Sequence, residues 1–152
     1  MQLQTFFFTN SVPQIQNKFN DGIWSALEGA LQSIGQKEEI YIVTGTAFNK
    51  IGEYKTISYT STKNDTNKQV PVPNYFYKVV LKVKKSGSTV TDAEAIGFWF
   101  ENKAYNNSTY ANYAVSVDQI EQWTGMDFFV NLTDTIENSA ESNTSWTAFQ
   151  SF

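Results

Sequence analysis

The sequence predicts an α+β fold in which one long helix and a short C-terminal helix pack against an antiparallel sheet. Three observations support this class. One stretch has helical spacing of its apolar residues, several stretches alternate apolar and polar residues, and the composition is 41% apolar and 16% aromatic. With this composition, 152 residues suffice to bury one core. No internal repeat is visible, which argues against a solenoid or a propeller.

The first two predicted elements are a strand and the long helix. Residues Leu3 to Phe8 are largely aromatic and are followed by a polar break, which is typical of a short buried strand. From Asn20 to Ile34, apolar residues recur at three- and four-residue spacing, and Gly35 is placed to end the helix. Asn20 or a neighbour would cap its start.

Period-two patterns follow the helix. "EIYIVTGTAF" predicts a strand that ends near Gly45, and "YKTISYTSTKNDTNKQ" predicts a polar strand and turn outside the core. In "VPVPNYFYKVVLKVKKSGST" the residues alternate between an apolar face (Tyr77, Val79, Leu81 and Val83) and a lysine face (Lys78, Lys82 and Lys84). The alternation predicts a half-solvated strand, a turn at residues 85–87 and a hairpin partner in "AEAIGFWFEN".

The last elements are a short helix and a polar segment. Ser116 precedes "VDQIEQWTG", in which Gln119 supports a capping box and Gly125 is placed to end the helix. Residues 133–152 are rich in Ser, Thr and Asn without clear periodicity, so we expect a polar C-terminal tail there. The predicted domain is therefore 1–132, with the tail at 133–152.

Three residue types are missing: the chain has no cysteine, no histidine and, since all eleven basic residues are lysines, no arginine. Disulfides and Cys/His zinc sites are therefore excluded from this chain. General-base catalysis by its own residues would fall to a carboxylate, a lysine or a tyrosine. The formal charge of -4 does not by itself indicate a nucleic-acid or membrane partner, so a polyanion would need a local lysine patch.

The start of the chain does not resemble a targeting segment. "MQLQTFFFTN" lacks a basic n-region, and its apolar run is too short for a signal peptide or a membrane span. We expect no membrane partner.

The stretch "TNSVPQIQNKFNDGIWSALE" contains Asn10, Asn20, Trp24 and Glu28 at spacings that resemble the metal-binding segment of the DNA/RNA non-specific endonucleases of the ββα-metal class. The resemblance continues in the same order through "IYIVTG", "VPVPNYFYKVVL", "AIGFWFEN" and "YAVSVDQIEQWTGMDFFVNL". It covers nearly everything from Phe6 to Leu132.

The resemblance implies a role for each of three residues. Asn20 would donate its amide oxygen to Mg²⁺, or to Mn²⁺ in its place, and Glu28 would orient the waters of the metal. Asn10 would be a further polar residue of the catalytic site, with a positioning role. The implied reaction is hydrolysis of phosphodiesters in DNA or RNA, and the implied location is secreted or periplasmic.

The chain differs from the family pattern because it contains no histidine. The family's general base is the histidine of an upstream Asp-Arg-Gly-His motif, and only nine residues precede Asn10 here. The family's arginine one turn beyond the helix glutamate corresponds to Gln32. The chain therefore resembles the C-terminal two thirds of the fold, and we expect it to be inactive by itself.

Three interpretations follow. The chain is part of a true nuclease whose histidine lies on the missing N-terminal part of the fold or on another chain; it is a degenerate relative that binds without cutting; or it is a structural domain of a larger assembly. A histidine-bearing upstream sequence or companion chain would favour the first. Missing strands would leave the sheet open, so this interpretation also predicts that the chain needs a partner.

Plainer readings exist for the same residues. Asn20 could serve only as a helix cap, and Glu28 could be a solvated helix residue. The lysines from Lys78 to Lys85 are more typical of the solvent face of a strand than of a phosphate-binding track. Trp24, Trp99 and Trp123 are expected to fill the core.

Overall fold

The computed structural model describes residues 11–107 and 109–152, so the predicted strand Leu3 to Phe8 lies outside the described residues. Its centre is a four-stranded antiparallel sheet in the order β1-β4-β5-β6. The strands are β1 (Ile40–Ala47), β4 (Tyr75–Ser86), β5 (Thr89–Glu101) and β6 (Ala114–Val115). The α+β class with an antiparallel sheet is confirmed.

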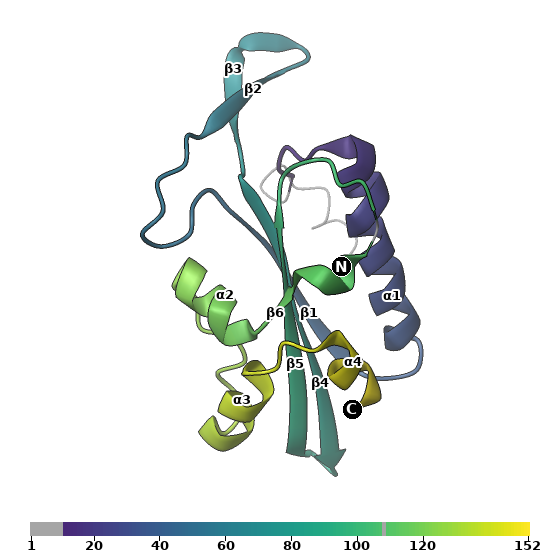
Figure 1. The fold of residues 1–152 in the computed structure, drawn as a ribbon. Helices are drawn as coiled ribbons and strands as arrows, with labels where there is room; N and C mark the ends of the chain where they lie inside the picture. Colours follow the sequence, from purple (N-terminus) through teal and green to yellow (C-terminus); the bar gives the residue numbers. More distant parts are fainter. Residues whose placement is uncertain (1–10, 108) are drawn as a thin grey trace.

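Helices cover both faces of this sheet (Figure 1). A kinked helical segment, η3 (Gln16–Trp24), leads into α1 (Ser25–Gly35), which packs on one face together with α4 (Trp146–Ser151). The other face carries α2 (Val117–Thr124) and α3 (Asp134–Glu141). A short 3₁₀ turn, η4 (Tyr110–Tyr113), precedes β6. No helix among residues 11–107 and 109–152 is long and apolar enough to cross a membrane.

Each face has its own apolar cluster, because β4 and β5 send alternate side chains to opposite sides. Under η3 and α1, fully buried side chains of the helices meet aromatic and branched side chains of the two strands; they include Phe19, Ile23, Leu27, Val80, Ile96, Phe98 and Phe100. Under α2 and α3 the buried set includes Tyr77, Val79, Ala95, Trp99, Val117, Ile120 and Phe128. The site-bearing helix is thus fixed on a rigid sheet.

The β4–β5 hairpin is confirmed, with Gly87 at φ 63° in its turn. Of the three lysines predicted to face solvent from β4, Lys84 is exposed, but the other two are buried. Lys78 and Lys82 are only 5% and 3% exposed. Lys82 pairs with Glu38 at 2.7 Å and lies over the ring of Phe149 in α4. Alternation of apolar and polar residues predicts on which side of a strand a residue lies, but not whether a helix covers that side.

The first third of the predicted long helix is not regular α-helix. Regular α-helix begins only at Ser25; Asn17, Lys18 and Gly22 of η3 have non-helical backbone angles. Asn20 therefore lies inside η3 and does not cap α1, whereas Gly35 does end it. The short helix α2 is as predicted: Ser116 Oγ accepts from Gln119 N at 3.1 Å, and Gly125 follows at φ 71°.

Two further segments lie outside the four strands of the central sheet. Residues after 132, predicted as a polar tail, contain α3 and α4, whose Ala140, Trp146 and Phe149 are buried against the sheet. A few well-spaced apolar residues are enough to anchor such short helices, although they are too few to form a recognisable helical pattern in the sequence. The hairpin β2 (Ser58–Thr62) and β3 (Asp65–Val72) projects from the body of the protein (Figure 1), as predicted for a polar excursion.

Candidate metal centre

Asn20 offers one amide oxygen from η3. Its backbone N–H donates to Ile15 O at 3.1 Å, and its side-chain Nδ2 donates to Gln16 Oε1 at 2.9 Å. No hydrogen bond within the described part of the chain uses its Oδ1. The side chain is half-buried, so its orientation is held through the nitrogen while the oxygen stays available to a ligand.

Glu28 lies two turns further along, in the first turn of α1, and it is held by a buried lysine. Lys78 Nζ is 3.2 Å from Glu28 Oε1 and donates to Thr44 Oγ1 at 2.9 Å. The same ammonium lies 4.4 Å from the centre of the Trp24 ring, a cation–π contact. Lys78 therefore joins α1 to the two strands beneath it and fixes one carboxylate oxygen of Glu28.

Lys78 is much more buried than its partner Glu28. The lysine side chain is 7% exposed, whereas that of Glu28 is 52% exposed. Burial lowers the pKa of Lys78, and the Glu28 carboxylate opposes this shift by its charge and hydrogen bond. The glutamate thus keeps an open side toward solvent while its position is set from below.

Asn102 fixes the chain segment that leads into η3. Its Nδ2 donates to Pro13 O at 3.2 Å and to Pro73 O at 3.0 Å, while its Oδ1 accepts from Ile15 N at 2.9 Å. One amide therefore satisfies three backbone groups from two segments far apart in the sequence. This arrangement sets where the chain enters the helix that carries Asn20.

A cavity of about 580 Å³ lies beside these residues. It is lined by Trp24, Thr44, Phe76 and the entry segment, including Gln14. Gln14 Nε2 is buried and has no partner among the residues that the structure describes. The residues that line the cavity therefore include an amide and a hydroxyl, groups that can donate to an anionic oxygen.

The structure places the predicted residues as follows. Asn20 and Glu28 lie on consecutive helical elements, with Trp24 between them. Asn10 lies outside the described residues, and Gln32 is exposed on α1. Sequence reasoning missed the roles of Lys78 and Asn102, because alternation assigned the lysine to solvent and an asparagine at the end of a strand carries no distinctive pattern.

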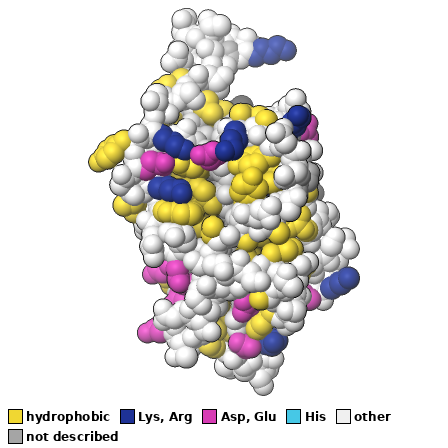
Figure 2. Space-filling view, in the orientation of Figure 1, with side chains coloured by type: hydrophobic (Ala, Val, Ile, Leu, Met, Phe, Trp, Pro, Cys, Tyr) yellow, Lys and Arg dark blue, Asp and Glu magenta, His cyan; other side chains and the backbone are white. Residues whose placement is uncertain are grey.

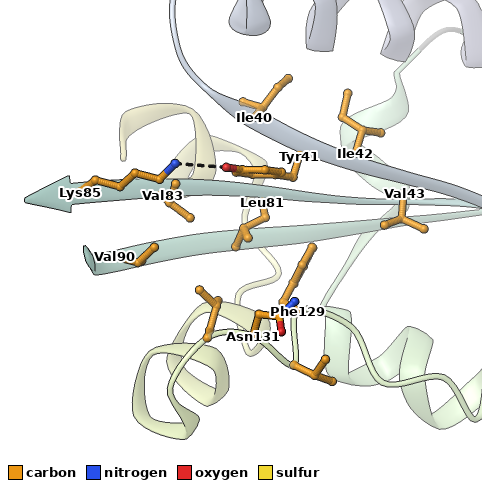
Figure 3. Close-up of a pocket in the computed structure, with 12 residues that line it drawn as sticks. Ile40, Tyr41, Ile42, Val43, Leu81, Val83, Lys85, Val90, Phe129 and Asn131 are labelled. Atoms are coloured by element: carbon orange, nitrogen blue, oxygen red, sulfur yellow. Dashed lines mark hydrogen bonds between the residues drawn. The ribbon is translucent and has the colours of Figure 1, made fainter. Parts of the chain in front are cut away.

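A second, apolar groove of about 680 Å³ lies at the outer side of β1. In Figure 3, Leu81 and Val90 of the hairpin face Phe129 across this groove, and Tyr41 of β1 lies at its rim, hydrogen-bonded to Lys85. Three consecutive residues of β1, Tyr41, Ile42 and Val43, are 38–44% exposed. Among the described strands β1 pairs only with β4, and no other described strand pairs with its second edge.

Comparison with known proteins decides the family. A family model described as DNA/RNA non-specific endonuclease matches residues 1–135. The chain belongs to this family. Its helices on an antiparallel sheet agree with the ββα-metal fold that the sequence resemblance implies.

The chain is also similar to several curated nucleases. The chain is 33% identical to Nuclease C1 of Cunninghamella echinulata var. echinulata over 133 residues, covering 85% of this chain and 50% of that protein. It is 30% identical to a nuclease of Syncephalastrum racemosum over 143 residues, covering 85% of this chain and 42% of that protein. It is 31% identical to "Nuclease EXOG, mitochondrial" of Mus musculus over 135 residues, covering 85% and 35%. The chain thus spans half or less of the length of these relatives.

Proposed function

We propose that this chain supplies the metal-binding part of a Mg²⁺-dependent non-specific endonuclease that hydrolyses phosphodiesters in DNA or RNA. The observation that carries the proposal is the pairing of Asn20 and Glu28 on consecutive helical elements of a chain from this family. Asn20 would hold the metal, and Glu28 would orient the metal's waters.

The residues present fit a small hard cation. Mg²⁺ prefers oxygen ligands and keeps most of its waters, so it needs few protein ligands. Asn20 Oδ1 has no other partner in the described chain, and Glu28 uses only one carboxylate oxygen for its ion pair with Lys78. When bound, the metal would stabilise charge on the phosphate and on the leaving oxygen. Mn²⁺ would serve in its place.

The substrate contacts would come from the cavity beside Trp24. Gln14, whose amide nitrogen has no partner among the described residues, and Thr44 line this cavity, and both side chains can donate to phosphate oxygens. These contacts carry no base information, which is in keeping with the name "non-specific" of the family.

The general base would come from outside this chain, because the chain contains no histidine. The part that supplies it would cover the apolar groove beside β1, at the edge of the sheet where no described strand pairs with β1, since strand edges and apolar patches favour association. The greater length of the relatives supports such a part, either as the missing N-terminal portion of the fold or as another chain.

A cleavage assay with added partner tests the proposal. The purified chain should cut plasmid DNA or RNA weakly or not at all in Mg²⁺, because a general base contributes about 10²–10⁴-fold. Addition of a fragment that carries the Asp-Arg-Gly-His strand should restore cleavage. The restored activity should fall in Asn20→Ala and survive in Asn17→Ala, a matched control at an exposed asparagine of the same segment. Strong cleavage by the chain alone would contradict this account of the missing histidine.

The missing histidine and arginine also favour a second candidate, a degenerate nuclease-like domain that binds or has a structural role. This candidate predicts that no histidine-bearing partner restores cleavage.

The secreted or periplasmic location implied by the resemblance is part of our proposal. The alternative is a mitochondrial location, because two of the relatives are named as mitochondrial nucleases. Fractionation of the source cells with an antibody to the chain distinguishes the two.

A further inference from the structure

We propose that Asp118, Glu121 and Glu141 form a second cation site, specific for Ca²⁺, which joins α2 to α3 on the sheet face opposite Asn20. The site is independent of the proposed nuclease function. Its role is to hold the two helices together.

The geometry brings three carboxylates to one point. Asp118 and Glu121 are three residues apart in α2 and so lie on the same side of the helix, and Glu141 is the last residue of α3. One oxygen from each residue lies within 4.8 Å of the others. Ca²⁺ holds its oxygen ligands at about 2.3–2.6 Å, so two oxygens on opposite sides of the ion are about 5 Å apart. The three oxygens therefore fit around one ion.

Glu141 is a buried carboxylate aimed into this cluster. The residue is only 4% exposed, and its Oε1 has no hydrogen-bond partner among the described residues. A second buried carboxylate oxygen without a described partner, Glu137 Oε1, belongs to the same helix. Burial of an acidic group without a partner is costly, and a bound cation would remove this cost.

The segment of the chain that carries Glu141 is acidic and contains no lysine. Residues 104–152 contain six acidic residues and no lysine, a formal charge of -6. Figure 2 shows acidic side chains over α2 and α3 without lysines among them. The carboxylates of α2 and α3 form no ion pair within the described chain.

The C-terminal end of α3 adds to the same preference. Glu141 stands at the C-terminal end of α3, where the partial negative charge of the helix disfavours a carboxylate and favours a cation. Glu121 already accepts from Phe128 N through Oε1 at 2.7 Å, which fixes its orientation and leaves its second oxygen for a ligand. Ca²⁺ accepts such irregular anionic sets, whereas Mg²⁺ demands near-ideal octahedral geometry and keeps its waters.

Calorimetric titration of the full chain with CaCl₂ tests the site. After removal of metals by chelation, we expect one Ca²⁺ per chain with a dissociation constant on the order of 10⁻⁴ M, and weaker binding of Mg²⁺ by at least about tenfold. Glu141→Gln and Asp118→Asn should each weaken Ca²⁺ binding by about tenfold or more. Asp118 is half-buried, so its variant keeps the test valid if the Glu141 variant does not fold.

Asp127→Asn is the matched control. Asp127 is exposed and acts on Glu141 only through its charge, and it is not one of the three residues that share the site. Its variant removes one negative charge from the same neighbourhood, and we expect Ca²⁺ affinity to stay within about threefold. Absence of binding at millimolar Ca²⁺, or an equal loss in the Asp127 and Asp118 variants, would overturn the proposal. Unchanged binding in Asn20→Ala would show that the two cation sites are separate.

Discussion

The ion pair between Glu28 and Lys78 leads to an unexpected stability prediction: removal of the exposed partner should cost more than removal of the buried one. Glu28→Gln leaves the Lys78 ammonium beneath α1 with only Thr44 and the Trp24 ring for compensation. Lys78→Met instead removes the buried charge and fills a similar volume, while Glu28 remains half-exposed to water. The two variants therefore separate burial of a charge from loss of a contact.

The magnitudes follow from the exposures of 7% for Lys78 and 52% for Glu28. Breaking a fully buried pair costs about 3–5 kcal/mol, and solvent near Glu28 reduces this figure. We expect Glu28→Gln to lower the free energy of unfolding by about 1–3 kcal/mol. Lys78→Met should stay within about 1 kcal/mol of the wild type, because an apolar side chain of similar volume often replaces a buried charge at little cost.

Urea unfolding at pH 7, monitored by tryptophan fluorescence, measures both values. Burial lowers the pKa of Lys78 below 10.5, so the unfolded state binds more protons between the lowered value and 10.5, and stability rises with pH in that window. Loss of the Glu28 carboxylate lowers the pKa of Lys78 further and so widens the pH range over which stability rises. The Glu28→Gln deficit should therefore shrink as pH rises toward about 10. A Lys78→Met variant less stable than Glu28→Gln would refute this reasoning.

Three other predictions concern single residues. Gly45→Ala would place a Cβ 2.2 Å from the buried Tyr77 ring and should destabilise the fold by about 2 kcal/mol or more, measured by urea unfolding. Asn102→Ala removes three hydrogen bonds to backbone, and we expect a loss of about 1–3 kcal/mol together with faster amide exchange in the segment before η3. Glu53 has its pKa lowered below 4.5, first by the hydrogen bond from Tyr75, so its stabilising contribution is present above pH 4.5 and is lost as pH falls through the lowered value. Tyr75→Phe should therefore flatten the decrease of stability between about pH 5 and pH 3; an unchanged slope would contradict this assignment.

Most of the sheet and the start of α2 could be predicted from local patterns, because alternation and a Ser-x-x-Gln cap depend on neighbouring residues only. The burial of Lys78 could not, since it depends on a helix more than forty residues earlier in the chain. The kink in η3 near Asn20 also escaped prediction, because the apolar spacing of this segment resembles that of an α-helix. The roles of Asn20 and Glu28 were predicted from the family pattern. The three hydrogen bonds of Asn102 could not be predicted, because they join chain segments that meet only in the fold.

Binding of a metal by Asn20 is the central claim, and titration of the isotope-labelled chain with Mn²⁺ tests it most directly. Paramagnetic broadening should appear at the amides of Asn20 and its neighbours in η3, apart from any broadening at α2 and α3. Asn20→Ala should abolish the η3 response and leave the other unchanged, while Asn17→Ala should keep both. A response around η3 that persists unchanged in Asn20→Ala, or no response there at millimolar Mn²⁺ in the presence of a phosphodiester, would contradict the account.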